Sequence, residues 1–153
     1  MNQPKGDLIE ILMVDDCAGD VELTQEALQA AKVRNHMTVA RDGEEALAML
    51  RQQGPHAQTP RPDLVLLDLN MPRKNGFEVL EAIKADEALR SIPVVILTSS
   101  QAEQDIAKSY QLHVNAYVAK PVGLQEFIQV VRAIEGFWLK IVRLPPNHQA
   151  RLA

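Results

Sequence analysis

Five polar residues follow short apolar runs of the sequence, where they could bind a metal or transfer a phosphoryl group. Asp15 and Asp16 follow the first run, Asp68 the third, Thr98 the fourth and Lys120 the fifth. In an open parallel sheet, the carboxyl ends of the strands form the edge at which ligands bind. If the apolar runs are strands of such a sheet, we expect these side chains to meet at one edge.

The residue types match phosphoryl-transfer chemistry. Three carboxylates in one cleft repel each other, and a hard divalent cation with oxygen ligands removes that repulsion. Magnesium is favoured, because it binds one or two carboxylates and keeps its waters and a phosphate oxygen. An aspartate can attack phosphorus, and the Lys120 ammonium and the Thr98 hydroxyl could then stabilise the phosphoryl oxygens. Each residue alone is more often a cap, turn or surface residue, so the hypothesis depends on their joint order.

The elements that would position these residues alternate between strand and helix. Short runs rich in β-branched residues or leucine predict buried strands at Ile9–Val14, His36–Ala40, Leu64–Leu67, Pro93–Leu97 and Val114–Val118. Apolar residues at helical spacing predict helices at Val21–Leu28 with Asp20 as its cap, Glu44–Leu50, Phe77–Lys84, Gln101–Leu112 and Gln125–Lys140. The alternation predicts an α/β fold with a doubly wound parallel sheet in one domain. Between two of these elements, Gln53–Pro62 is expected to be an exposed loop.

Composition excludes several classes of protein. The chain has 153 residues, of which 46% are hydrophobic and 24% charged, so it can bury a globular core. The net charge of −4 argues against nucleic acid as a partner. Cys17 is the only cysteine, which excludes a disulfide framework and fits a reducing compartment. We see no apolar run long enough for a membrane span or a signal peptide, and therefore expect a cytoplasmic protein.

Four separated motifs resemble the receiver domain of two-component response regulators. They are Asp15-Asp16 after an apolar strand, Leu64 to Pro72 with Gly76, Leu97-Thr98-Ser99, and Tyr117 to Pro121. The resemblance covers about residues 8–140, with 141–153 as a C-terminal tail. It implies a flavodoxin-like (βα)5 fold with a five-stranded parallel sheet in the order 2-1-3-4-5.

The resemblance also implies a role for each matching residue of the metal site. Asp68 is the phospho-acceptor. Asp16 is a direct Mg²⁺ ligand, Asp15 acts mainly through a metal-bound water, and Asn70 supplies its backbone carbonyl.

Other matching residues would sense the phosphoryl group. Thr98 and Lys120 contact it, Tyr117 is the switch aromatic, and the bond between Lys120 and Pro121 is expected to be cis. Tyr117 could equally be an ordinary half-exposed surface residue. His113 departs from the family pattern, because receivers often have glycine at this position after the fourth helix. A left-handed backbone is harder for histidine than for glycine, so the shape of this corner is left open.

A narrower resemblance concerns the partner. Gly19-Asp20-Val21, Asn70 to Gly76 and the ending Phe137-Trp138-Leu139 resemble the receivers paired with bacterial phytochrome kinases, especially those of cyanobacteria. This implies a sensor histidine kinase as phosphodonor. We see too little sequence after Lys140 for an output domain, so we expect signalling through protein contacts or a phosphorelay.

The last predicted helix carries more apolar surface than one buried face needs. The excess suggests a partner, and a homodimer requires only one self-complementary patch. Phe137, Ile141 and Leu144 are the dimer candidates. The alternative, that Trp138 and its neighbours fold back on the same domain, is almost equally supported.

Two other functions compete with a signalling receiver that is not an enzyme. A magnesium-dependent phosphohydrolase could use Asp68 as its nucleophile, but Asn70 stands where a second acid would be needed as general acid. A scaffold that is never phosphorylated would not require the acid pair, Thr98 and Lys120.

Overall fold

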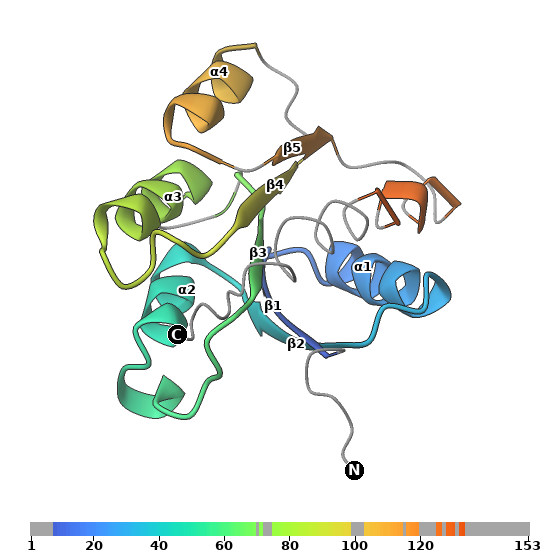
Figure 1. Cartoon of the computed structure of the whole chain (residues 1–153), viewed down its shortest axis with the longest axis horizontal. Helices are drawn as coiled ribbons and strands as arrows, with labels where there is room; N and C mark the ends of the chain where they lie inside the picture. Colours follow the sequence, from blue (N-terminus) through green and yellow to red (C-terminus); the bar gives the residue numbers. More distant parts are fainter. Residues whose placement is uncertain are drawn as a thin grey trace, which may run out of the picture.

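The computed structural model describes residues 8–69, 71, 75–98, 103–114, 116–119, 125–126, 128–130 and 132–133 (Figure 1). Its strands are β1 (Ile9–Val14), β2 (Asn35–Ala40), β3 (Leu64–Leu67), β4 (Val94–Thr98) and β5 (Ala116–Ala119). Its helices are α1 (Ala18–Ala30), α2 (Gly43–Leu50), the short 3₁₀ helix η2 (Gly54–His56), α3 (Gly76–Ala85) and α4 (Glu103–Gln111). The described residues between 125 and 133 are also helical. The predicted alternation of strand and helix is confirmed, and η2 lies within the predicted loop.

The five strands form one parallel sheet in the order β2-β1-β3-β4-β5. The predicted fold class is therefore confirmed. The fourth strand starts one residue later than expected, at Val94. Pro93 has no N–H for the sheet ladder, although its carbonyl accepts a hydrogen bond from the Val65 N–H at 3.0 Å. The fifth strand is also displaced toward the C-terminus, to Ala116–Ala119.

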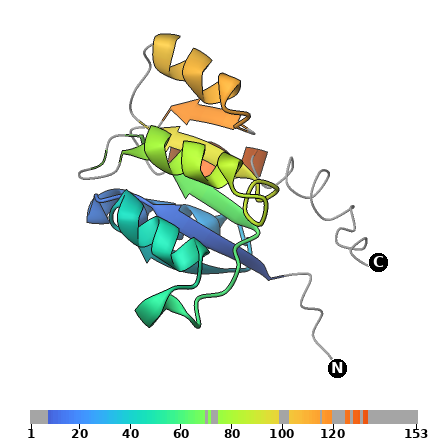
Figure 2. The same cartoon turned by 90° about the vertical axis from the view of Figure 1, so that its left-hand side faces the viewer.

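The sheet is covered on both faces, with α2 and α3 on one side and α1 on the other (Figures 1 and 2). Successive strand residues point to opposite faces. Leu12 and Val14 accordingly belong to the core under α2 and α3, whereas Ile11 and Met13 belong to the core under α1. Because β1, β3 and β4 are buried on both faces, their sequences are nearly continuous apolar runs.

The start of β3 is tied to β1 by a reciprocal pair of hydrogen bonds. The Asp63 N–H donates to the Glu10 carbonyl at 2.7 Å, and the Glu10 N–H donates to Asp63 Oδ2 at 2.9 Å. This pair lies just before the paired residues Ile11 and Leu64, so it helps to set how the two strands align.

The helix starts follow their capping residues, with one correction. Asp42 caps α2 by accepting from the Glu45 N–H, and Asn75 forms a complete capping box with Glu78 at the start of α3. The prediction that Asp20 caps α1 is wrong. Helix α1 begins at Ala18, and Asp20 lies inside its first turn, where its charge favours the helix dipole.

In the part of the chain that the structure describes, no helix is long and apolar enough to cross a membrane.

Candidate phosphoryl and metal site

Three carboxylates come together at the carboxyl ends of the two central strands. Asp15 and Asp16 follow β1, Asp68 follows β3, and one oxygen of each lies within 4.8 Å of the others. The cause is the strand register. Val14 is paired with Leu67 in neighbouring parallel strands, so the next residue of each strand emerges at the same edge. The predicted convergence of these acids is therefore present.

The three carboxylates differ in their exposure to solvent. Asp15 is 0% exposed and Asp68 is 6% exposed, whereas Asp16 is exposed. A buried carboxylate is costly without a compensating partner or cation. The cluster therefore combines a buried acidic floor with one solvent-facing acid, through which a cation or a phosphoryl donor can approach.

The backbone holds both buried acids in place. The Asp15 N–H donates to the Ala40 carbonyl of β2 at 3.0 Å, and the Asp68 N–H donates to the Val14 carbonyl of β1 at 3.0 Å. The Asp15 side chain is also oriented, because its Oδ1 accepts a hydrogen bond from the Cys17 N–H at 2.9 Å. Cys17, the exposed residue that precedes α1, thus contributes its backbone rather than its thiol.

Thr98 ends β4, the strand next to β3, and is fully buried. Leu67 is paired with Ile96, so Thr98 extends one residue beyond the level of Asp68 at the same edge of the sheet. Two other predicted site residues, Asn70 and Lys120, lie outside the described residues, as does the bond to Pro121.

Tyr117 and His113 belong to the part of the fold around β5. Tyr117 is half-buried, is paired with Ile96 and packs against the core under α2 and α3. His113, just after α4, has a φ of 65°, which is the left-handed conformation. The sequence left the shape of this corner open. The structure shows it to be left-handed, and histidine adopts it at a steric cost that glycine would not have.

Gly76 supports the loop that follows Asp68, by a contact that residue types alone do not predict. Its N–H donates to the Leu69 carbonyl at 3.0 Å. A Cβ atom at this position would lie 2.4 Å from the Asp68 carbonyl oxygen and 2.6 Å from the Leu69 Cα. In the sequence, Gly76 is only part of a motif that resembles receivers, whereas the structure requires a residue without a side chain at this position.

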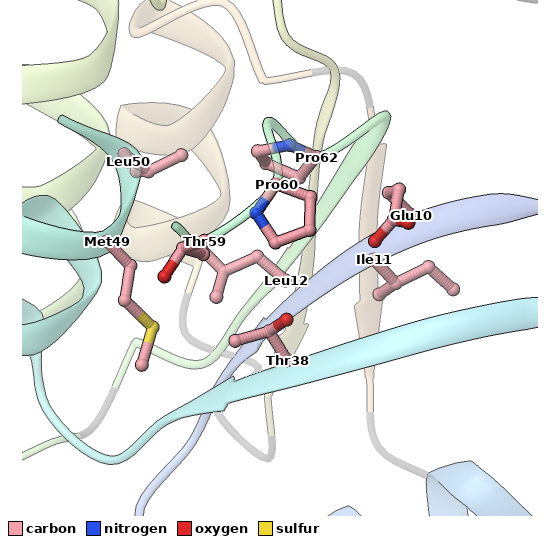
Figure 3. Close-up of a pocket in the computed structure, with 9 residues that line it drawn as sticks. All are labelled: Glu10, Ile11, Leu12, Thr38, Met49, Leu50, Thr59, Pro60 and Pro62. Carbon is pink, nitrogen blue, oxygen red and sulfur yellow. The ribbon is translucent and has the colours of Figure 1, made fainter. Parts of the chain in front are cut away.

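A hollow lies at the other end of β3 from the carboxylates (Figure 3). Its lining includes Leu12, Met49 and Leu50, together with Pro60 and Pro62 of the loop before β3. Asp68 follows β3, so this mainly apolar hollow is separated from the carboxylates by the length of the strand. It contributes no group to the acidic site.

The proposed dimer residues Phe137, Ile141 and Leu144 lie outside the described residues. Within the helical segment that precedes them, Ile128 is buried against the core on the α1 side of the sheet.

Comparison with known proteins gives consistent matches over most of the chain. A model of the response regulator receiver domain matches residues 11–132. Response regulator Rcp1 of Synechocystis sp. is 47% identical over 135 residues, covering 88% of this chain and 92% of Rcp1. A probable methanogenesis regulatory protein, FilR2 of Methanothrix harundinacea, is 37% identical and covers 92% of this chain and 94% of its own.

Solved structures agree with these sequence matches. The crystal structure of the Mn²⁺-bound form of Rcp1 has a TM-score of 0.81 and 46% identity, covering 90% of this chain and 99% of that chain. The phosphorylated cyanobacterial phytochrome response regulator RcpA has a TM-score of 0.83 and 49% identity, covering 90% and 98%.

Proposed function

The chain belongs to the response regulator receiver domain family, and from that premise we propose that Asp68 accepts a phosphoryl group from a sensor histidine kinase. The observation that carries the proposal is the convergence of Asp15, Asp16 and Asp68 within 4.8 Å at the carboxyl edge of the sheet. Phosphorylation at this edge would change the surface that the protein offers to its partners.

In the proposed reaction, a carboxylate oxygen of Asp68 attacks the phosphorus of a kinase phosphohistidine. The O–P bond forms as the P–N bond breaks, and the electron pair of that bond returns to the imidazole nitrogen. Charge spreads over the phosphoryl oxygens during transfer. The Thr98 hydroxyl would donate a hydrogen bond to one of these oxygens, and the Lys120 ammonium would offset their negative charge.

The donor set fits magnesium, a hard cation that prefers oxygen ligands. When bound, Mg²⁺ would neutralise negative charge on the acids and on the phosphoryl group. Asp16 would bind it directly, Asp68 would share it, Asp15 would act through a water, and Asn70 would add its carbonyl. The similarity to the Mn²⁺-bound form of Rcp1 supports a divalent ion here.

Receivers of phytochrome response regulators work with histidine kinases, and we propose a phytochrome kinase as the partner of this chain. The support is its 49% identity to the phytochrome response regulator RcpA. We also propose a cytoplasmic homodimer, formed through Phe137, Ile141 and Leu144, that does not bind nucleic acid and has no enzymatic activity toward other substrates. The switch would use Thr98 and Tyr117.

Intact-protein mass spectrometry after incubation with acetyl phosphate tests the central step. We expect one added phosphoryl group on the parent protein in the presence of Mg²⁺, and none without it. Asp68→Ala should remain unmodified. Glu81→Ala, which removes one exposed carboxylate from α3, is the matched control and should be phosphorylated like the parent.

Three outcomes would refute the proposal in different ways. An adduct on Asp68→Ala would place the acceptor elsewhere. No adduct on the parent would indicate a scaffold that is not phosphorylated. Continuous consumption of donor with no lasting adduct would favour a phosphohydrolase.

A further inference from the structure

One contact links α4 to the first turn of α3. The Lys108 Nζ lies 4.6 Å from the centre of the Phe77 ring. Lys108 is in the last turn of α4 and is exposed, whereas Phe77 is the second residue of α3 and is half-buried. An ammonium at this distance from an aromatic face is attracted by the ring quadrupole.

Phe77 is adjacent to the residue that supports the phospho-acceptor. Gly76 donates its N–H to the Leu69 carbonyl at 3.0 Å and packs directly on the Asp68 backbone. The capping box between Asn75 and Glu78 makes this first turn of α3 locally rigid. Because Gly76 packs closely on the Asp68 backbone and is hydrogen-bonded to Leu69, a displacement of the first turn of α3 toward this loop is transmitted to Asp68.

Helix α4 is not deeply anchored in the described structure. None of its described side chains is buried, and Tyr110 is 51% exposed. By contrast, α3 buries four residues: Gly76, Val79, Leu80 and Ile83. The helix lies beside β5 at the edge of the sheet (Figures 1 and 2), and Lys108 in its last turn contacts Phe77 of α3.

We propose that Lys108 and Phe77 are positioning residues for the phospho-acceptor. Their contact holds the first turn of α3, which holds the backbone of Asp68 through Gly76. It also makes the position of α4 and the geometry of Asp68 depend on each other. This inference rests on the proposed function, because its readout is phosphorylation of Asp68.

The test is the rate of phosphorylation by acetyl phosphate at saturating Mg²⁺, measured on the full chain. We expect Lys108→Gln to slow the reaction about two-fold and at most about five-fold, since an exposed cation–π contact of about 0.5–1 kcal/mol corresponds to that range. Lys108→Arg keeps a cation over the ring and should restore the parent rate. Lys32→Gln removes an equal charge at the exposed end of α1 and should react like the parent.

A second comparison separates the contact from general effects on the helix. Phe77→Leu keeps an apolar side chain against the core but removes the ring. In that background, Lys108→Gln and the unchanged Lys108 should react at equal rates. The thermal midpoint of Lys108→Gln should fall by no more than about 4 °C, the loss expected for one exposed contact in a chain of this length, so unfolding does not account for a slower reaction.

Equal rates for the parent and Lys108→Gln would overturn this inference and leave the proposed function intact. So would a loss of rate in Lys108→Gln that persists unchanged in the Phe77→Leu background, or one that Lys108→Arg does not restore. A parent protein that accepts no phosphoryl group would overturn the proposed function and this inference together.

Discussion

The close packing of Gly76, at the start of α3, against the Asp68 backbone can be tested by adding a single methyl group. In Gly76→Ala the new Cβ would lie 2.4 Å from the Asp68 carbonyl oxygen and 2.6 Å from the Leu69 Cα. Both neighbours are backbone atoms, so no side chain can rotate away, and the loop or the helix must move by several tenths of an ångström. Overpacking against two backbone atoms costs about 2–3 kcal/mol, the upper part of the usual range. The gain in helix propensity, up to about 1 kcal/mol, offsets only part of that cost.

We therefore expect Gly76→Ala to lower the free energy of unfolding by about 1–2 kcal/mol, with a thermal midpoint lower by about 2–8 °C for a chain of this length. Urea denaturation followed by circular dichroism measures the first quantity. The rate of phosphorylation should fall as well, because Asp68 is displaced.

Gly19→Ala is the matched control, since Gly19 also lies in the first turn of a helix. A Cβ there would meet only the Cys17 Sγ, at an ordinary 3.9 Å. This variant should be neutral or more stable by up to about 1 kcal/mol. If Gly76→Ala is as stable as Gly19→Ala, the close packing inferred between Gly76 and Asp68 is refuted.

Three further predictions concern the metal site, the corner after α4 and a half-buried lysine. At constant ionic strength, Mg²⁺ at a hundred-fold excess over its Kd should stabilise the fold by about 2.7 kcal/mol and therefore raise the thermal midpoint. Asp16→Asn should reduce this increase. A midpoint that Mg²⁺ does not change would contradict the metal site. His113→Gly should raise stability in urea by up to about 1 kcal/mol because φ is 65°, and a decrease would contradict a strained corner. Burial lowers the pKa of Lys84 below its ordinary 10.5, so the unfolded chain binds more protons than the folded chain and the free energy of unfolding should rise with pH toward 10.5. In urea denaturation at several pH values, Lys84→Met should lack this part of the rise. An identical pH profile for the variant and the parent would refute the prediction.

The elements buried on both faces could be predicted most accurately. Leu64–Leu67 was predicted with the same bounds as β3, because every residue of this run is buried and apolar. The acids at the strand ends followed from the same pattern, since parallel strands share one carboxyl edge. The start of α1 was missed for a related reason. Apolar spacing marks where the helix first touches the core, at Val21, whereas Ala18 and Gly19 are helical but exposed.

Packing distances could not be predicted from residue types. Gly76 is a turn residue in the sequence, and only the structure shows the Asp68 carbonyl at a distance that excludes a side chain. Similarly, Lys108 and Phe77 lie 31 residues apart and have no common pattern. Their contact depends on α4 being placed beside α3 by β4, the strand that separates the two helices in the chain.

The reciprocal hydrogen bonds between Glu10 and Asp63 have a consequence for the opposite end of the sheet. Strand alignment changes only in whole residues, and one residue corresponds to about 3.3 Å along the strand. A slip of one residue between β1 and β3 would therefore displace Asp68 from Asp15 by most of the 4.8 Å that now encloses the three acids, and would turn its carboxylate to the other face. The separation of the acids can therefore change only in steps of whole residues, and a pair of hydrogen bonds five residues before Asp15 and Asp68 helps to select the observed alignment.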